Sequence, residues 1–150
     1  MAESKYQLLI KLADEKQQAA AERMSLAQNA LNQARMRLEQ LDNFREEYRQ
    51  RLMAGGSQGM SVIQYQDFCR FLLRLDEAMV QQKQDVDRCT QRFVLERQAW
   101  QLEYKKLKAY EKLLQRERER EALQEAKREQ KRSDEFATRQ FWDRTHGEDA

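Results

Sequence analysis

The side chains of this 150-residue chain that could do chemistry are few and far apart. The single histidine, His146, stands in the terminal stretch RTHGEDA, and the two cysteines, Cys69 and Cys89, share one proline-free segment. If that segment is a helix, the two thiols lie ~30 Å apart, which is too far for a disulfide. Their spacing also differs from that of metal ligands. We therefore expect free, reduced thiols and no metal or other cofactor.

Two other arrangements are poor candidates for catalytic sites. The stretch GGSQG, residues 55–59, lacks the Lys followed by Ser or Thr that a phosphate-binding loop needs. Glu96 and Glu103 would lie ~10 Å apart along one helix with no pocket around them, which is a poor acid/base pair. Catalytic side chains acquire perturbed pKa values in concave, dehydrated cavities, and no such cavity is expected in a narrow helical protein. The sequence therefore predicts a protein that is not an enzyme.

Composition argues for a thin core. Charged residues make up 36% of the chain and the mean hydropathy is -1.06, which is too polar for a thick globular interior. The 28 Lys and Arg nearly balance the 26 Asp and Glu, so overall charge gives no strong attraction to nucleic acid or an anionic membrane. No apolar run approaches the ~20 residues that span a bilayer, and the N-terminus is too acidic for a secretory signal. We expect a cytoplasmic protein.

The elements that position these residues are two long amphipathic helices. Apolar or small residues recur at alternating steps of four and three, which is the pattern of a coiled-coil seam. In the first segment they are Ala20, Met24, Ala27, Leu31, Ala34, Leu38, Leu41, Tyr48 and Leu52, interrupted by Arg45. In the second they are Tyr65, Phe68, Leu72, Leu75, Met79, Gln82, Val86, Cys89, Phe93, Glu96, Trp100, Glu103, Leu107, Tyr110 and Leu114.

Three of the four glycines lie between the two segments, and the chain has no proline. A short glycine-rich connection leaves each apolar stripe no nearer partner than the other, so we predict an all-α, antiparallel two-helix coiled-coil hairpin forming a single domain. The expected elements are a helix over about 5–53, a turn over 54–61, a longer helix over about 62–141 and a flexible C-terminus over 142–150. Ser4 with Gln7, and Ser61 with Gln64, match the capping box of a helix start.

If residues pair symmetrically about the glycines, the N-terminal end of the first helix lies opposite roughly Tyr110. Lys16 then lies opposite position 99, between Glu96 and Glu103, where its charge would disfavour other registers of helix pairing. Beyond that point the seam register reaches Glu117 and Glu121, so apolar contact stops there.

The overhanging end of the second helix carries segregated rows of like charge. One row consists of Glu117, Glu121, Glu125 and Glu129, and beside it lie the pairs Arg116 with Arg120, Lys127 with Lys131, and Arg128 with Arg132. Such rows suit a partner of matching charge pattern. The alternative is a solvated helical face or a fraying tail.

The stretch FCRFLLRLDEAMV, residues 68–80, holds more apolar side chains than a seam uses. A stripe at helical spacing, formed by Phe71, Leu75, Ala78 and Gln82, straddles the edge of the seam near the glycines. We expect a contact surface there. The alternatives are a broad seam or self-association into a four-helix bundle.

These residues resemble the FliJ family, the coiled-coil component of the bacterial flagellar type III export apparatus. The resemblance covers almost the whole chain. Its most specific parts are the approach to the turn at residues 48–56, YQDF at 65–68, LDEAM at 75–79 and DEFA at 134–137.

The resemblance implies a non-enzymatic, central-stalk-like coiled coil on the cytoplasmic face of the flagellar basal body. Such proteins bind the hexameric export ATPase ring, promote its assembly or activity, and contact the export-gate membrane protein and export chaperones. The gate-binding stripe then matches Phe71, Leu75, Ala78 and Gln82. The charged overhang, with Arg116, Glu117, Arg120 and Glu121, is expected to meet the ATPase ring.

Three other functions remain open at this point. One is the equivalent stalk of a virulence type III secretion system, which shares the architecture. A second is a structural coiled coil that assembles with itself through Phe71 and Leu75. A third, a helical arm that binds RNA, is disfavoured because Glu residues interleave with the basic residues of the overhang, whereas phosphate binding favours a net basic stripe.

Overall fold

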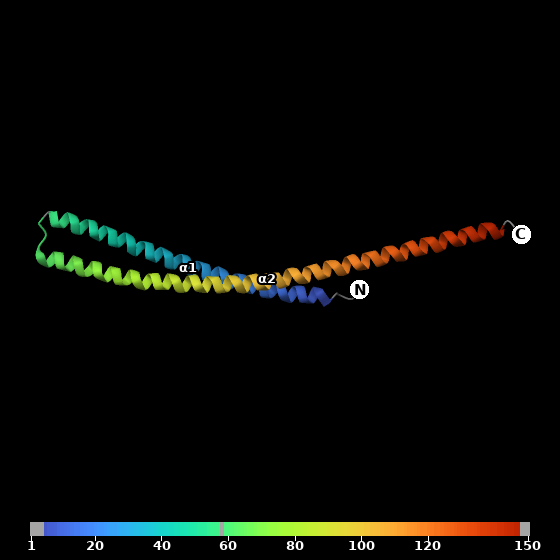
Figure 1. Cartoon of the computed structure of the whole chain (residues 1–150), viewed down its shortest axis with the longest axis horizontal. Helices are drawn as coiled ribbons and strands as arrows, with labels where there is room; N and C mark the ends of the chain where they lie inside the picture. The colour runs from blue at the N-terminus through green and yellow to red at the C-terminus, as the bar shows by residue number, and fades with distance from the viewer. Residues whose placement is uncertain (1–4, 58, 148–150) are drawn as a thin grey trace. The chain divides into compact units, whose positions relative to one another are not determined.

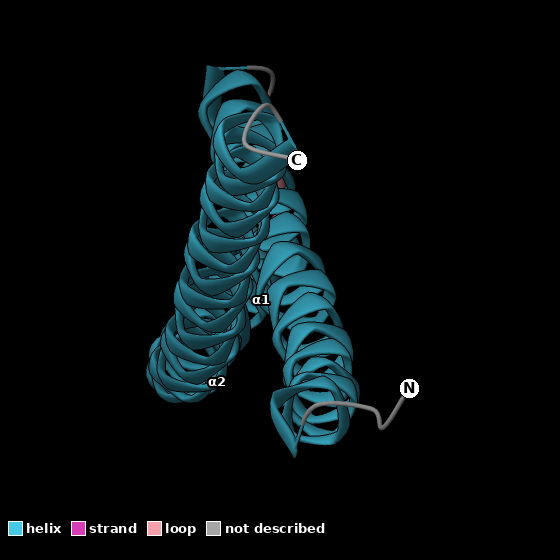
Figure 2. Cartoon of the chain, turned by 90° about the vertical axis from the view of Figure 1, so that its right-hand side faces the viewer, coloured by secondary structure: helices cyan, strands magenta, loops and turns pink. Residues whose placement is uncertain are grey.

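The computed structural model describes residues 5–57 and 59–147. They form two helices, α1 (Lys5–Ser57) and α2 (Val62–Gly147), joined by one short loop (Figure 1). Coloured by secondary structure, the described chain is helix almost throughout (Figure 2). The predicted all-α hairpin with a longer second helix is confirmed. Residues 148–150, part of the predicted flexible C-terminus, lie outside the described residues.

Both helices end later than the sequence predicts. α1 continues past Met53 through Gly55 and Gly56, and α2 continues past Phe141 to Gly147. The chain turns instead at Gly59, whose φ of 82° lies in the left-handed region that favours glycine. The backbone N–H of Met60 donates to the carbonyl of Gly55 at 3.0 Å. This bond and the left-handed glycine before Met60 form the Schellman motif that closes many helices, so Gly55 and Gly56 stay helical.

The start of α2 is capped as the sequence predicts. Gln64 donates its backbone N–H to Ser61 Oγ at 3.2 Å, and Gln64 Oε1 accepts from the backbone N–H of Ser61 at 3.4 Å. These reciprocal bonds satisfy two backbone donors that the helix itself leaves unpaired, which is the capping box. Ser4 of the other predicted cap lies outside the described residues.

The chain divides into two compact units, and each is treated by itself. The first, Glu15–Tyr104, holds the loop and the parts of α1 and α2 next to it, which run antiparallel and side by side (Figure 1). Its most deeply buried side chains are Ala20, Ala27, Leu31, Ala34, Leu75 and Met79. All belong to the predicted seams. Tyr65 is the exception among the predicted seam residues of this unit, because it is 49% exposed.

The second unit contains the start of α1, up to Asp14, and α2 from Lys105 onward. Ala13 and Leu107 are buried in it. Ala13 lies seven residues before Ala20, so a row of alanines at heptad spacing, Ala13, Ala20, Ala27 and Ala34, runs along α1. Small side chains at every second seam position let two helix backbones approach closely.

The pairing is shifted from the predicted register. In the first unit, Arg23 pairs with Glu96 and Arg45 with Asp76. In the second unit, Lys5 and Tyr6 line a hollow with residues of α2 between Leu113 and Arg120, well beyond the Tyr110 expected. The reason is the late end of α1. The loop is centred near Gly59 rather than on the GGSQG stretch as a whole, so each α1 residue faces a later residue of α2.

Candidate interaction surfaces

The stripe predicted to bind a partner is largely turned toward α1. Leu75 is only 8% exposed and belongs to the seam. Gln82 is half-buried, and its side-chain Nε2 donates to the backbone carbonyl oxygen of Ala34 on α1 at 2.9 Å. Ala78 is half-buried, and Phe71 is 38% exposed. The structure thus places Phe71 and Ala78 at the seam's edge, where they are accessible, and Leu75 and Gln82 inside the contact between the helices.

Phe71 is held by an aromatic cluster near the loop. Its ring centroid lies 4.4 Å from that of Tyr48 on α1, and Phe68 packs against the same tyrosine at 5.8 Å. The guanidinium of Arg51 lies 5.5 Å from the Tyr48 ring centroid, within the range of a cation–π contact. Tyr48 therefore orients the exposed edge of Phe71. The sequence pattern placed Tyr48 only in the seam; its aromatic type opposite two phenylalanines is the signal that could have revealed this contact.

More apolar surface surrounds this end of the hairpin. Outside the stripe, several large apolar side chains are at least half exposed: Phe44, Met53, Val62, Ile63, Leu73 and Val80. They lie on both helices and follow no single stripe. The apolar surplus predicted for residues 68–80 is therefore part of a broader apolar region around the loop.

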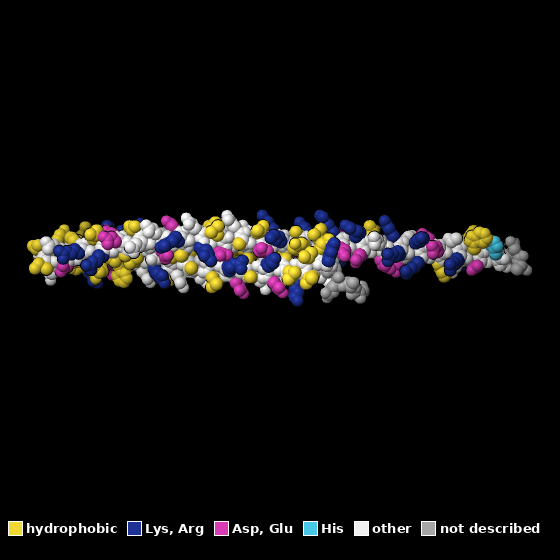
Figure 3. Space-filling model, turned by 90° about the horizontal axis from the view of Figure 1, so that it is seen from below, with side chains coloured by type: hydrophobic (Ala, Val, Ile, Leu, Met, Phe, Trp, Pro, Cys, Tyr) yellow, Lys and Arg dark blue, Asp and Glu magenta, His cyan; other side chains and the backbone are white. Residues whose placement is uncertain are grey.

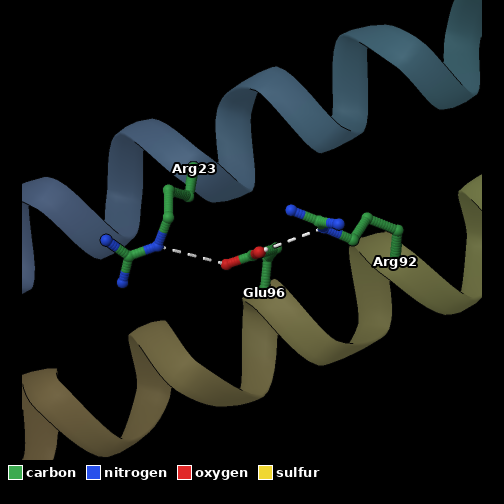
Figure 4. Close-up of polar contacts among 3 residues, drawn as sticks. All are labelled: Arg23, Arg92 and Glu96. Atoms are coloured by element: carbon green, nitrogen blue, oxygen red, sulfur yellow. Dashed lines mark hydrogen bonds and ion pairs between the residues drawn. The ribbon is translucent and has the colours of Figure 1, made fainter.

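Ion pairs and hydrogen bonds interrupt the seam at fixed points. Glu96, whose side chain is 15% exposed, lies between Arg23 of α1 at 3.4 Å and Arg92 of its own helix at 3.2 Å (Figure 4). Figure 4 shows the carboxylate reaching toward both guanidiniums. At Glu96 the cation from α1 is Arg23 rather than the predicted Lys16.

Arg45 interrupts the α1 seam as the sequence indicates. Its guanidinium binds Asp42 on its own helix at 2.9 Å and Asp76 across the seam at 3.4 Å. Farther along, Trp100 donates its indole N–H to Gln17 Oε1 at 2.8 Å. This bond was not predicted, although Gln17 stands at heptad spacing from Met24. These polar contacts link specific positions of the two helices and thereby oppose a sliding of one past the other.

The predicted ring-binding residues lie at the start of a long exposed segment. Arg116, Glu117 and Arg120 line the hollow with Lys5 and Tyr6, while Glu121 lies beyond it. Every residue from Arg118 to Gly147 is exposed, and we call the part of α2 from Arg116 to Gly147 the overhang. Basic and acidic side chains both occur along it, and apolar side chains gather near its end beside the single histidine (Figure 3). There Trp142 stacks on His146, with ring centroids 4.2 Å apart.

Among residues 5–57 and 59–147, no helix is long and apolar enough to cross a membrane, and no cluster of three metal-ligating side chains occurs. Cys69 is exposed and Cys89 is half-buried, and both are free thiols. The side chains that converge on one another are those of the seam contacts and the aromatic cluster.

Comparison with known proteins gives a consistent result. The family model described as flagellar FliJ protein matches residues 2–146. A flagellar FliJ protein of Escherichia coli (strain K12) is 27% identical over 128 residues, covering 85% of this chain and 87% of the relative. A flagellar FliJ protein of Salmonella typhi matches at the same identity and coverage. With nearly its whole length matched, this chain belongs to the FliJ family of flagellar proteins.

Proposed function

We propose that the protein is a non-enzymatic component of the flagellar type III export apparatus that acts as a stalk-like coiled coil for the export ATPase. Membership of the FliJ family supports the flagellar assignment over the stalk of a virulence secretion system. The observation that carries the proposed ATPase contact is the overhang. A helix with thirty consecutive exposed residues and side chains of both charges leaves a large surface for a partner.

In this proposal the hexameric export ATPase contacts the end of the hairpin around Arg116, Glu117, Arg120 and Glu121. The hollow there is lined by charged side chains of both helices, which are Lys5 of α1 and Arg116, Glu117 and Arg120 of α2. A ring whose inner surface carries acidic side chains would find a cluster of cations at this end.

The export-gate membrane protein is proposed to bind near the loop, at the stripe of Phe71, Leu75, Ala78 and Gln82. Because Leu75 and Gln82 face α1, the direct contact in this proposal comes from Phe71 and Ala78, with Leu75 and Gln82 holding the helix that presents them. Export chaperones are a third proposed class of partner, and no residues are assigned to them. The protein would work in the cytoplasm, at the cytoplasmic face of the basal body.

Co-purification with the flagellar ATPase tests the main proposal. We expect the protein to co-purify with the ATPase and to raise ATP turnover when added to it. Reversing Arg116 and Arg120 to Glu should weaken both effects while leaving helical circular dichroism unchanged. Reversing Arg70 and Arg74, an exposed pair at the same spacing in the other unit, is the matched control. Equal binding by both double variants would contradict the proposed ring contact.

A parallel pair of variants tests the gate contact. Phe71→Ala should reduce binding to the gate protein, whereas Leu73→Ala, which removes a neighbouring exposed side chain outside the stripe, should not. Because Phe71 packs on Tyr48, the thermal midpoint of each variant is measured alongside binding. Equal losses from the two variants would point to general apolar adhesion around the loop.

A further inference from the structure

Between Leu123 and Gln140, the overhang presents a face on which no residue is charged. At alternating steps of three and four, this face carries Leu123, Ala126, Gln130, Ser133, Ala137 and Gln140. All six are exposed, in a segment where charged residues occupy most of the other positions. Heptad spacing is that of a coiled-coil contact, and Leu123, Ala126 and Ala137 supply its apolar part, while Gln130, Ser133 and Gln140 make it more polar than the seam of a stable coiled coil. We call it the neutral stripe.

The neutral stripe is separate from the seam that packs on α1. Continued beyond Leu114, the seam register passes through Glu117, Glu121, Gln124 and Arg128, so that face becomes charged. The neutral stripe runs two positions later in the heptad, about 200° around the helix axis. The seam face of α2 therefore becomes charged beyond the start of α1, and the opposite face of α2 is uncharged from Leu123 to Gln140.

We propose that the overhang pairs with the overhang of a second copy of this chain, as an antiparallel two-helix coiled coil through the neutral stripe. A two-fold axis between Lys131 and Arg132 makes the stripe self-complementary. Ala126 then packs against Ala137 of the second copy, Leu123 against Gln140, and Gln130 against Ser133. The contact is about 38 Å long if it spans the ~25 residues from 119 to 144.

The charges beside the stripe select this pairing. In an antiparallel pair, positions on the same flank of the two helices face each other. On one flank, Lys127 faces Asp134 of the second copy, and symmetry repeats the ion pair. Arg120 on that flank faces Phe141, a favourable arrangement of cation and ring. On the other flank, Glu129 faces Phe136, so no like charges oppose each other.

Alternative pairings bring like charges together. Sliding one helix by a heptad in one direction places Asp134 opposite Asp134, and sliding it in the other direction places Lys127 opposite Lys127. A parallel pair places Glu129 opposite Asp134 on both sides. Like charges directly across such an interface are destabilising, so of these pairings the flanking charges favour the antiparallel register centred between Lys131 and Arg132.

The expected association is weak and reversible. The stripe contains one large apolar residue, Leu123, and two alanines, and the exposed rings of Phe136 and Phe141 add to it at the flanks. A contact of this length falls at the small end of stable interfaces, about 1,200 Å² in total. We therefore expect a dimer that forms in the micromolar range. Such a dimer overlaps the surface proposed for the ATPase, so the two associations would compete.

A charge exchange on the full-length chain tests the pairing. Lys127→Asp alone places two carboxylates opposite each other, and Asp134→Lys alone places two ammonium groups opposite each other, twice per dimer in each case. Each single variant should weaken dimerisation about tenfold, measured by sedimentation velocity over a concentration series, because two exposed ion pairs become two repulsions. The double variant restores opposite charges across the interface and should recover the wild-type dissociation constant. If either residue acted only by stabilising its own helix, the second substitution would not restore dimerisation. Recovery in the double variant therefore shows a charge contact between the two copies.

Matched controls use charges that point away from the stripe. Arg132→Asp and Glu135→Lys make the same charge changes within the overhang but on other faces, and they should leave dimerisation unchanged. Circular dichroism shows whether each variant keeps its helix. A chain that stays monomeric at every concentration would overturn the proposal, as would a dimer that is indifferent to Lys127 and Asp134.

Spin labels distinguish the direction of pairing. In a background without Cys69 and Cys89, a label at position 132, which points away from the stripe, should lie close to its mate in the dimer, because it is near the two-fold axis. A label at position 144 should lie ~40 Å from its mate, because the two ends point in opposite directions. A short distance at position 144 would mean a parallel dimer and would contradict the proposed register.

Discussion

Gln82 of α2 donates its side-chain amide to the backbone carbonyl oxygen of Ala34, 2.9 Å away on α1. This bond ties a polar side chain in one seam to the main chain of the other. Since Gln82 also belongs to the stripe proposed for the export gate, it could act by binding a partner or by holding the hairpin. The two roles predict different outcomes.

Substitutions of Gln82 separate these roles. Gln82→Ala removes the bond to Ala34 and should lower the free energy of unfolding by about 1 kcal/mol, the usual net value of such a hydrogen bond. Gln82→Leu places an apolar side chain in the seam and should unfold at a urea concentration equal to or above that of the wild type. If Gln82 only holds the hairpin, Gln82→Leu keeps gate binding; loss of gate binding in that stable variant would show a direct contact.

The row of alanines along α1 predicts that a larger side chain in the row would not fit between the helices. Ala27 is 8% exposed between the helices, so Ala27→Leu should force them apart and lower the free energy of unfolding by about 1–3 kcal/mol, measured by urea denaturation. Ala30→Leu is the control, because Ala30 is exposed on the same helix and a leucine there meets solvent. Equal stability of the two variants would mean that the helices are not in close contact at Ala27.

Replacing Gly59 and Gly56 with alanine should change the stability of the hairpin in opposite directions. Gly59→Ala puts a Cβ on a residue with φ of 82° and should destabilise the hairpin by about 1 kcal/mol. Gly56→Ala adds a methyl group to the end of a helix where no atom lies within 4 Å, and should stabilise it by about 0.5–1 kcal/mol. Thermal unfolding of both variants checks the pair, and a stabilising Gly59→Ala would refute the left-handed turn.

The ion pairs of Glu96 predict a dependence on salt. Glu96→Gln removes the carboxylate that Arg23 and Arg92 share, and both arginines are more than half exposed, so the loss should be only about 0.5–1 kcal/mol. The difference from the wild type should shrink as the salt concentration rises, because exposed charges are screened. A difference that persists in high salt would indicate that Glu96 contributes through packing or hydrogen bonding.

Much of the fold could be predicted because it rests on periodic patterns. The recurrence of Ala20, Ala27 and Ala34 along α1 specified one seam, and the capping pair Ser61 and Gln64 marked where α2 begins. The residue at which α1 ends could not be predicted from such a pattern. Glycine is compatible with both helix and turn, and only the left-handed backbone at Gly59 and the bond from Met60 to Gly55 show which glycine makes the turn.

The candidate surfaces were less predictable than the fold. Heptad spacing placed Leu75 and Gln82 both in the seam and in the proposed stripe, and the pattern alone does not say which role each side chain serves. The bond from Gln82 to Ala34 shows that Gln82 lies in the contact between the helices. Likewise, the contact between Tyr48 and Phe71 joins residues of two helices, so no pattern within one helix reveals it.

The two tryptophans of the chain lie in different surroundings, one in each unit. Trp100 is half-buried and hydrogen-bonded to Gln17, whereas Trp142 is exposed and stacked on His146. Their fluorescence should therefore differ, with an indole shielded from water in one case and open to quenchers such as iodide in the other. The native molecule thus carries one optical reporter for the seam and another for the overhang, and replacing either tryptophan with phenylalanine isolates the other's signal.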